Sequence, residues 1–139
     1  MRYLLDTVTL SEPTKPRPDP GVLQWIGSTE PDAKYISILT IAEVRRGIAL
    51  MRQREPGAAA RLMLWLDAQR NLFADRVLPI GDAVADVWGE LGRGRTLPVM
   101  DSLIAATALA HDLTLVTRNT RDFAGLGVTL FNPWQRAGR

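Results

Sequence analysis

The stretch VMDSLIAATALAHDLTLVT, residues 99–117, decides how this chain folds. Its first part, Val99–His111, is apolar nearly all round, as expected of a central helix whose alanines allow close approach to a sheet. After a short break, Thr114–Thr117 has the pattern of a buried strand. A central helix followed at once by a buried strand is typical of an α/β protein with a parallel sheet.

Strands and helices also alternate outside that stretch. Further strands are predicted at Arg2–Asp6, Lys34–Ile38, Val77–Ile80 and Val128–Phe131. Further helices are predicted at Val22–Gly27, Thr40–Arg54, Ala58–Phe73 and Asp82–Leu91, and the proline-rich segment Pro13–Pro20 is expected to be an exposed loop. The alternation predicts a three-layer α/β/α fold with a mostly parallel sheet of about five strands. At 139 residues, the chain is expected to form one domain, 1–139.

Four acidic residues are expected to meet at one edge of this sheet. Each comes just after a predicted strand or in the first turn of a helix, and they are Asp6, Glu43, Asp101 and Asp122. The carboxyl ends of parallel strands form the edge where such folds build their sites. Four converging carboxylates repel one another strongly unless a cation neutralises them. Because Mg²⁺ prefers oxygen ligands and such a cation activates water, the pattern indicates a Mg²⁺- or Mn²⁺-dependent phosphodiesterase.

Three of these acids also have a structural explanation that needs no chemistry. The run from Thr40 to Glu43 has the form of a capping box, of which Glu43 is the reciprocal half. Asp101 in a first helical turn interacts favourably with the helix dipole, and Asp122 fits an ordinary turn. Asp6 is the hardest to explain in this way, because it directly follows a buried strand.

Composition excludes several other chemistries. There is no cysteine, so thiolate metal sites and thiol nucleophiles are excluded. The single histidine, His111, and the lack of a G-x-S-x-G elbow argue against a serine triad. The net charge is +2, and 15 of the 17 basic residues are arginine, which suits phosphate or reflects a GC-rich genome. No apolar run approaches the roughly 18 residues of a membrane span, so a cytoplasmic location without membrane contact is expected.

Four blocks of sequence resemble the signature blocks of PIN-domain ribonucleases. They are Leu4–Thr7, Ser37–Gly47, Asp101–Ala108 and Leu115–Phe123, in this order. The chain is most similar to the VapC-type toxins of bacterial toxin–antitoxin pairs, including the FitB-like branch, and the likeness extends from residue 3 to Trp134. The resemblance implies a type II toxin that acts as a Mg²⁺- or Mn²⁺-dependent endoribonuclease and leaves a 5′-phosphate.

The resemblance also implies roles for individual residues. The family's metal-binding and catalytic acids fall on Asp6, Glu43, Asp101 and Asp122. Of these, Asp6 and Asp101 are expected to contact the metal directly, while the other two complete the shell or position water. The family's polar positions beside the site, expected to bind substrate, fall on Thr7, Thr117 and Asn119. One position departs from the family pattern: many relatives carry asparagine where this chain has Val8, which is expected to weaken the orientation of Asp6 or of a water.

The family also implies partners. Its toxins pair with a small antitoxin whose tail wraps the toxin and blocks its site, and homodimers and larger toxin–antitoxin assemblies are typical. The apolar helices 41–51 and 58–73 are candidate contact surfaces, although core packing explains them as readily. An alternative function stays open, that of a catalytically weak PIN-fold module which acts mainly by binding its antitoxin or RNA. A phosphoacceptor receiver is disfavoured, because it needs a lysine after a late strand and the only lysines are Lys15 and Lys34.

Arginine and tryptophan side chains are further candidates for contact with RNA or a partner. The arginines that either line an RNA path or serve surface solubility are Arg45, Arg46, Arg93, Arg95, Arg118 and Arg121. The tryptophans expected to anchor the core or an interface, rather than stack on bases, are Trp65, Trp88 and Trp134.

Overall fold

Five short parallel strands form the centre of the computed structural model, which describes residues 1–134; the last five positions of the predicted domain lie outside the described residues. In chain order the strands are β1 (Tyr3–Leu5), β2 (Lys34–Ser37), β3 (Val77–Leu78), β4 (Thr114–Val116) and β5 (Leu130–Phe131). In space their order is β3-β2-β1-β4-β5, and every neighbouring pair is parallel. The predicted parallel sheet is therefore confirmed, with β1 at its centre.

The register of β1 against β4 sends neighbouring side chains to opposite faces of the sheet. Leu4 pairs with Leu115, and both belong to a buried cluster that also contains Ile104. Leu5 pairs with Val116, and both belong to a second cluster. These four strand residues are at most 1% exposed. Both faces of the central strands are thus buried, which is why the strands read as continuous apolar runs.

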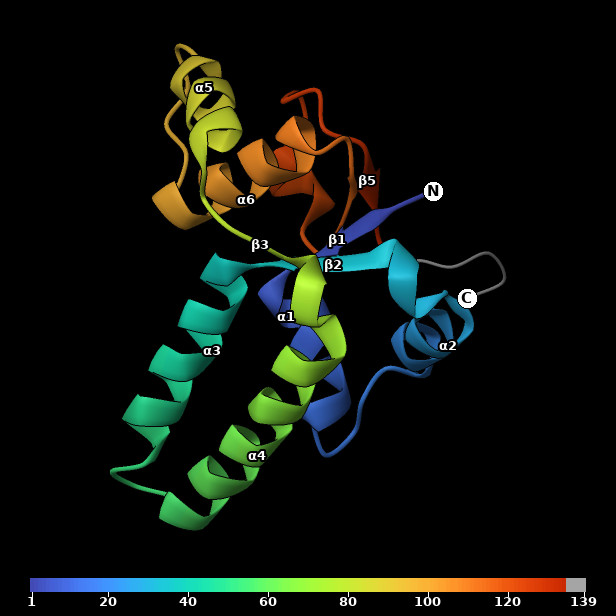
Figure 1. The fold of residues 1–139 in the computed structure, drawn as a ribbon, viewed down its shortest axis with the longest axis vertical. Helices are drawn as coiled ribbons and strands as arrows, with labels where there is room; N and C mark the ends of the chain where they lie inside the picture. Colours follow the sequence, from blue (N-terminus) through green and yellow to red (C-terminus); the bar gives the residue numbers. More distant parts are fainter. Residues whose placement is uncertain (135–139) are drawn as a thin grey trace.

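Helices cover both faces of the sheet (Figure 1). On the Leu4 face, α6 (Val99–Ala110) packs on the strands and α5 (Asp82–Glu90) packs on α6. The helices on the other face are α1 (Thr7–Ser11), α2 (Pro20–Ser28), α3 (Ile38–Met51) and α4 (Pro56–Phe73). This arrangement is the three-layer α/β/α fold that the alternation predicts.

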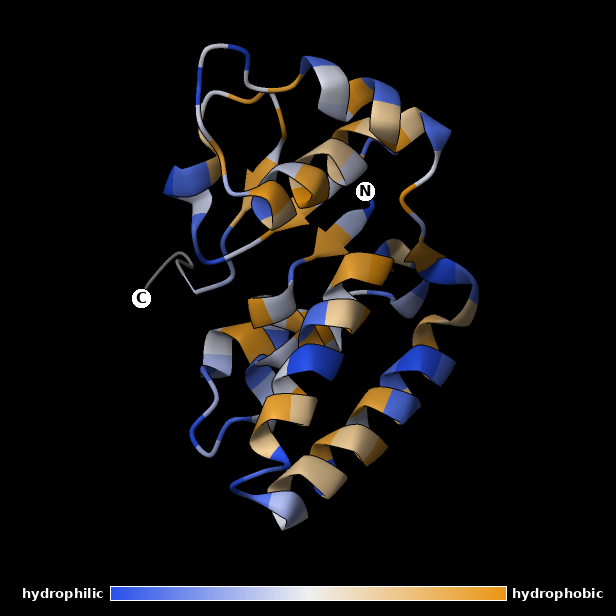
Figure 2. Cartoon of the chain, turned by 90° about the vertical axis from the view of Figure 1, so that its left-hand side faces the viewer, coloured by the Kyte–Doolittle hydropathy of each residue, from blue (hydrophilic) through white to orange (hydrophobic). Residues whose placement is uncertain are grey.

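Helices α3 and α4 run side by side as a hairpin that extends away from the sheet (Figure 1). Ile48, Ala59 and Leu66 form a separate buried cluster between them. Figure 2 shows hydrophobic bands along this hairpin, and two of its leucines, Leu50 and Leu64, are 61% and 72% exposed. The hairpin therefore packs internally and still presents apolar side chains to solvent. Among residues 1–134, no helix has both the length and the apolar character required to cross a membrane.

Several predicted element boundaries are wrong. The proline-rich segment is not all loop, because Pro13 lies in a 3-10 turn and Pro20 opens α2 with Asp19 as its N-cap. Helix α1, of five residues, is missing from the predicted elements because it is too short to show a hydrophobic period. Other elements end a few residues early: α3 ends at Met51 rather than Arg54.

Candidate active site

A small cavity opens at the carboxyl edge of the sheet, just beyond the ends of β1 and β4. Its volume is about 90 Å³, which is room for several water molecules. The four predicted acids come to it from four elements: Asp6 after β1, Glu43 on α3, Asp101 on α6 and Asp122 in the 3-10 turn Thr120–Phe123. The remaining lining residues are Thr7, Val8, Ile104, Asn119 and Phe123. The structure thus brings together all four acids that the sequence singles out.

Asp6 is fixed by a helix cap that the sequence analysis missed. It is the N-cap of α1, and its Oδ1 accepts hydrogen bonds from the N–H of Thr9 at 2.8 Å and from the Thr9 hydroxyl at 2.7 Å. The backbone N–H of Asp6 donates to the carbonyl of Val116 at 3.1 Å, which holds it beside β4. No residue in the described part of the chain donates to Oδ2. The cap therefore orients the carboxylate and leaves one oxygen available; the signal for it was an aspartate followed three residues later by threonine.

Glu43 is not part of a capping box, so that prediction is wrong. Helix α3 begins at Ile38, and Ser37 caps it by accepting from the N–H of Leu39 at 3.0 Å. Glu43 instead accepts a hydrogen bond from the Thr7 hydroxyl, with 2.5 Å between Oγ1 and Oε1. A hydrogen bond to a charged carboxylate is short and strong. Helix capping therefore does not explain Glu43. The Thr7 hydroxyl instead orients the Glu43 carboxylate at the cavity.

Asp101 lies in the first turn of α6, where the negative charges of the other three acids repel its own. Burial raises the pKa of its carboxyl, and the charges of Asp122, Glu43 and Asp6 raise it further. The helix dipole favours a negative charge at this position. Because the net shift of the pKa is nevertheless upward, burial and repulsion outweigh the favourable interactions. An added cation would relieve both the repulsion and the unfavourable ionisation.

The turn after β4 carries Asn119 and Asp122, and two other residues shape it. Thr117 is fully buried, and its hydroxyl accepts from the N–H of Asn119 at 3.1 Å. The prediction that Thr117 contacts the substrate directly is therefore wrong, because its side chain is fully buried. Asn119 itself is exposed at the cavity. The Arg95 guanidinium donates to the carbonyl of Asp122 at 2.9 Å. Arg95, predicted for an RNA path or for solubility, thus also supports the turn that bears the fourth acid.

The donor atoms of the cavity suit a hard divalent cation. They are carboxylate, hydroxyl and amide oxygens, which Mg²⁺ and Mn²⁺ prefer. Within residues 1–134, however, no three His, Asp or Glu side chains form a ready cage for a metal ion. Mg²⁺ is usually bound by one or two carboxylates and keeps several waters, so a complete cage is not required. Asp6 has an available Oδ2, and Asp101 has a raised pKa, so its ionised form is disfavoured without a nearby positive charge. Both features fit a partly hydrated cation.

Val8, the departure from the family pattern, lies in the wall of this cavity and is 36% exposed. Its side chain offers no hydrogen bond to water or to Asp6. The departure therefore falls inside the site and removes no carboxylate from it.

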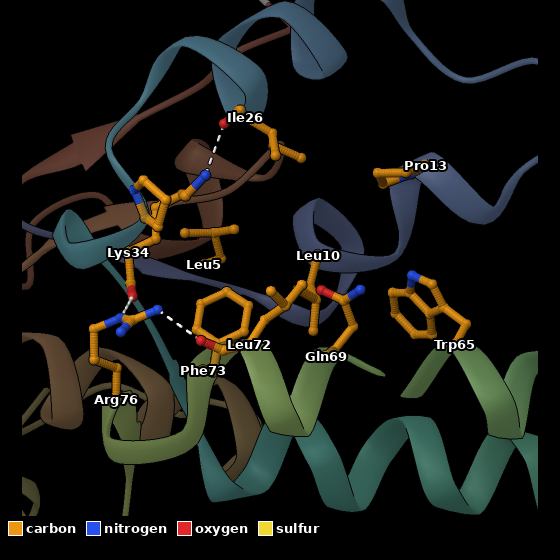
Figure 3. Close-up of a pocket in the computed structure, with 11 residues that line it drawn as sticks. Leu5, Leu10, Pro13, Ile26, Lys34, Trp65, Gln69, Leu72, Phe73 and Arg76 are labelled. Carbon is orange, nitrogen blue, oxygen red and sulfur yellow. Dashed lines mark hydrogen bonds between the residues drawn. The ribbon is translucent and has the colours of Figure 1, made fainter. Parts of the chain in front are cut away.

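A second, larger cavity lies between α4 and the segment that runs from α1 to α2 (Figure 3). Its volume is about 290 Å³. Figure 3 shows Trp65, Gln69 and Phe73 on α4, facing Leu10 and Pro13. The walls are mostly apolar, so this cavity suits an apolar side chain rather than a metal or a phosphate.

Two basic residues border this apolar cavity (Figure 3). Lys34 is 9% exposed, and its Nζ donates to the carbonyl of Ile26 at 2.7 Å. Burial lowers the pKa of the Lys34 ammonium, and the charge of Arg76 lowers it further, while Glu30 acts in the opposite direction. Arg76 donates to the carbonyls of Lys34 and Leu72, at 3.0 and 2.9 Å. The cavity is thus apolar with two basic side chains at its edge, of which Arg76 also lies 3.6 and 3.4 Å from the carboxylates of Asp32 and Asp75.

Known proteins are similar to this chain in sequence and in fold. Residues 3–127 match the family described as PIN domain. Toxin FitB of Neisseria gonorrhoeae is 36% identical over 136 residues, which cover 94% of this chain and 97% of that toxin. The VapC ribonuclease Y4jK of Sinorhizobium fredii is 34% identical over 96% of this chain and 99% of that protein. Among solved structures, FitAcB from Neisseria gonorrhoeae matches with a TM-score of 0.89 at 36% identity, covering 96% of this chain and 99% of the matched chain.

Proposed function

This chain belongs to the PIN-domain family, and on that premise we propose that it is the toxin of a type II toxin–antitoxin pair, an endoribonuclease that hydrolyses RNA phosphodiester bonds. The observation that carries the proposal is the convergence of Asp6, Glu43, Asp101 and Asp122 on one cavity from four separate elements. Relatives named as a toxin and as a VapC ribonuclease match almost the whole chain and support the same activity.

The proposed cofactor is Mg²⁺, with Mn²⁺ as a substitute. When bound, such a cation supplies positive charge opposite the phosphate and makes a water more acidic. Asp6 would hold it through the oxygen that the α1 cap leaves available, and Asp101 would supply the second carboxylate. The rise in the pKa of Asp101 supports this choice, because burial and then the charges of three neighbouring acids disfavour its ionised form, and a cation would favour that form.

The other residues of the cavity position water and RNA. Glu43 and Asp122 would orient the attacking water, and either carboxylate could take a proton from it. The Thr7 hydroxyl holds Glu43 for this task, and Asn119, which is exposed at the cavity, would contact the RNA beside the bond that is cut. Ile104 and Phe123 are apolar parts of the lining and would limit the water that reaches the carboxylates.

The proposed partner is a small cognate antitoxin, in an assembly that also contains a toxin homodimer in the cytoplasm. Solved structures similar to this chain include FitAcB and FitAB bound to a DNA fragment, the latter with a TM-score of 0.89. The apolar cavity of Figure 3 is suited to a partner segment that carries apolar side chains, because its walls are mostly apolar. The exposed leucines of the α3–α4 hairpin are suited to contact with a second copy.

The test is cleavage of RNA by the purified protein. We expect cleavage in Mg²⁺ or Mn²⁺, products that carry a 5′-phosphate, and no cleavage in excess EDTA. The Asp101→Asn variant should lose cleavage, whereas Asp82→Asn, which changes an exposed first-turn acid of α5, should keep it. Equal cleavage in EDTA contradicts the metal-dependent mechanism.

The alternative is a catalytically weak module that acts by binding its antitoxin or RNA. Val8 favours it, since the cavity wall has an apolar side chain where many relatives have a polar one. A Val8→Asn variant discriminates between the two. If wild-type protein is inactive and Val8→Asn restores metal-dependent cleavage, the binding module is the better description.

A further inference from the structure

Two hollows extend the acid cavity along the surface of the protein. The first, of about 300 Å³, shares Asn119 and Asp122 with the acid cavity. The second, of about 480 Å³, shares Arg118 with the first and reaches Arg17 and Trp134. Because each hollow shares lining residues with the next, the two hollows adjoin each other and the acid cavity, and together they are called the trough.

Arg118 and Trp134 form a fixed pair in this trough. The Arg118 guanidinium lies 5.5 Å from the centre of the Trp134 ring, a cation–π arrangement. Asn132, which is 9% exposed, ties the two segments together. Its Nδ2 donates to the carbonyl of Arg118 at 3.3 Å, and its Oδ1 accepts from the N–H of Trp134 at 2.9 Å. The pair is thus pre-positioned at the surface, which lowers the entropic cost of binding there.

The two hollows are lined by four basic side chains, Lys15, Arg17, Arg118 and Arg121, and by three acidic ones, Glu12, Asp19 and Asp122. Three arginines have no carboxylate within 4.0 Å among residues 1–134, and they are Arg17, Arg118 and Arg121. Of the acids, Glu12 pairs with Lys15 at 2.9 Å, Asp19 caps α2, and Asp122 belongs to the acid cavity. A row of arginines beside a cluster of four acids suits a chain of phosphates whose one scissile member must approach those acids.

We propose that this trough holds the single-stranded RNA that flanks the bond to be cut. Arg118 pairs with a flanking phosphate, and Trp134 gives an unpaired base a stacking surface, a role contrary to the expectation that Trp134 is only an anchor. Arg121 and Arg17 extend the contact on either side of Arg118. The inference rests on the proposed function, because it assigns the substrate's flank to the same site. An acidic peptide of the partner is the competing occupant, and the experiment includes it.

The experiment measures binding of a labelled single-stranded oligoribonucleotide of about twelve nucleotides to full-length protein at several salt concentrations. All variants carry Asp101→Asn so that the RNA stays intact. Arg118→Ala is compared with Arg54→Ala, which removes the same charge at the exposed α3–α4 turn, at the far end of the hairpin in Figure 1. Arg118→Lys keeps the charge and loses the planar fork, and Trp134→Phe keeps a ring where Trp134→Ala does not.

Arg118→Ala should raise the Kd about tenfold and lower the slope of log Kd against log salt by about 0.7, the value for one phosphate contact on a single strand. Arg118→Lys should keep the slope and lose part of the affinity. Trp134→Ala should weaken binding about tenfold, and Trp134→Phe should recover most of it. Arg54→Ala should change neither quantity. If Arg118→Ala has the slope and Kd of Arg54→Ala, the inference is overturned.

Two further measurements separate the possible failures. Cleavage of RNA by the protein without Asp101→Asn tests the proposed function alone. The salt dependence of RNA binding by Arg118→Ala, measured in the inactive Asp101→Asn background, tests the inference alone. A protein that cleaves RNA while Arg118→Ala leaves the slope unchanged keeps the function and loses the trough. If Arg118→Ala weakens binding of an acidic peptide but not of RNA, the trough belongs to the protein partner and the inference is wrong.

Discussion

Replacing Asp101 by asparagine should have opposite effects on stability without and with a divalent cation. In the metal-free protein the variant removes a carboxylate whose pKa is raised by burial and by three neighbouring acids. The folded chain therefore binds this proton more tightly than the unfolded chain, where the pKa has its ordinary value of 3.8. Stability from the protonated group is present below that value and is lost as the pH rises through the higher folded pKa.

The magnitude follows from competing effects. Each like-charge contact in a partly exposed site costs about 0.2–1 kcal/mol, and Asp101 has three of them. Loss of the favourable dipole interaction costs the variant about 0.3–1 kcal/mol. The net expectation at neutral pH is a variant about 1 kcal/mol more stable, or about 2–4 °C higher in Tm for a chain of this size. With Mg²⁺ at about 100 times its Kd, the wild type gains about 2.7 kcal/mol and the order reverses.

The assay is thermal or urea unfolding of both proteins in EDTA and in Mg²⁺, at pH about 3 and about 7. Asp82→Asn is the matched control, because Asp82 is an exposed acid in the first turn of α5 and lies outside the acid cavity. It should be destabilised by about 0.3–1 kcal/mol in either buffer. The reasoning is refuted if Asp101→Asn is less stable than the wild type in EDTA at neutral pH, or if Mg²⁺ stabilises both proteins equally.

Three other results are expected. Thr7→Val removes the hydroxyl that orients Glu43 and should slow RNA cleavage about 10- to 100-fold while leaving the fold intact; an unchanged rate excludes this positioning role. Mn²⁺ affinity should fall as the pH drops through the raised pKa of Asp101, because the proton competes with the cation, and a calorimetric titration across pH checks this. Trp88→Phe loses the 2.8 Å hydrogen bond from the indole N–H to the Ser102 hydroxyl, which joins α5 to α6. It should lower the free energy of unfolding by about 0.5–1.5 kcal/mol. A denaturant titration that finds the same free energy of unfolding for both proteins contradicts this expectation.

The sequence predicted the sheet, both helix layers and the convergence of the acids, because these follow from burial. Leu4, Leu5, Leu115 and Val116 are buried on two faces, so their strands read as apolar runs that only a parallel sheet between helices accommodates. Once the strands are parallel, the residues that follow them must gather at one edge. Asp6 and Asp122 reach the cavity for this reason.

The side-chain hydrogen bonds that join different elements of the fold could not be predicted from the sequence. Ser37 and Thr40 are both residue types that commonly cap helices, and the sequence alone does not show which of them caps α3; in the structure it is Ser37. Thr117 follows a strand as a substrate-binding residue would, yet the turn after it closes over its side chain. The tie between Arg118 and Trp134 through Asn132 joins two segments far apart in the chain, so local pattern carries no trace of it.

The measurement that tests the central claim most directly is a paired titration with Mn²⁺. Cation binding is followed by calorimetry, and RNA cleavage is followed in the same preparation, for the wild type and for Asp6→Asn and Asp101→Asn. The four-acid mechanism predicts that cleavage rises with occupancy of the cation site, and that both variants lose binding and cleavage together. Cleavage at the wild-type rate in either variant, or without bound cation, contradicts it.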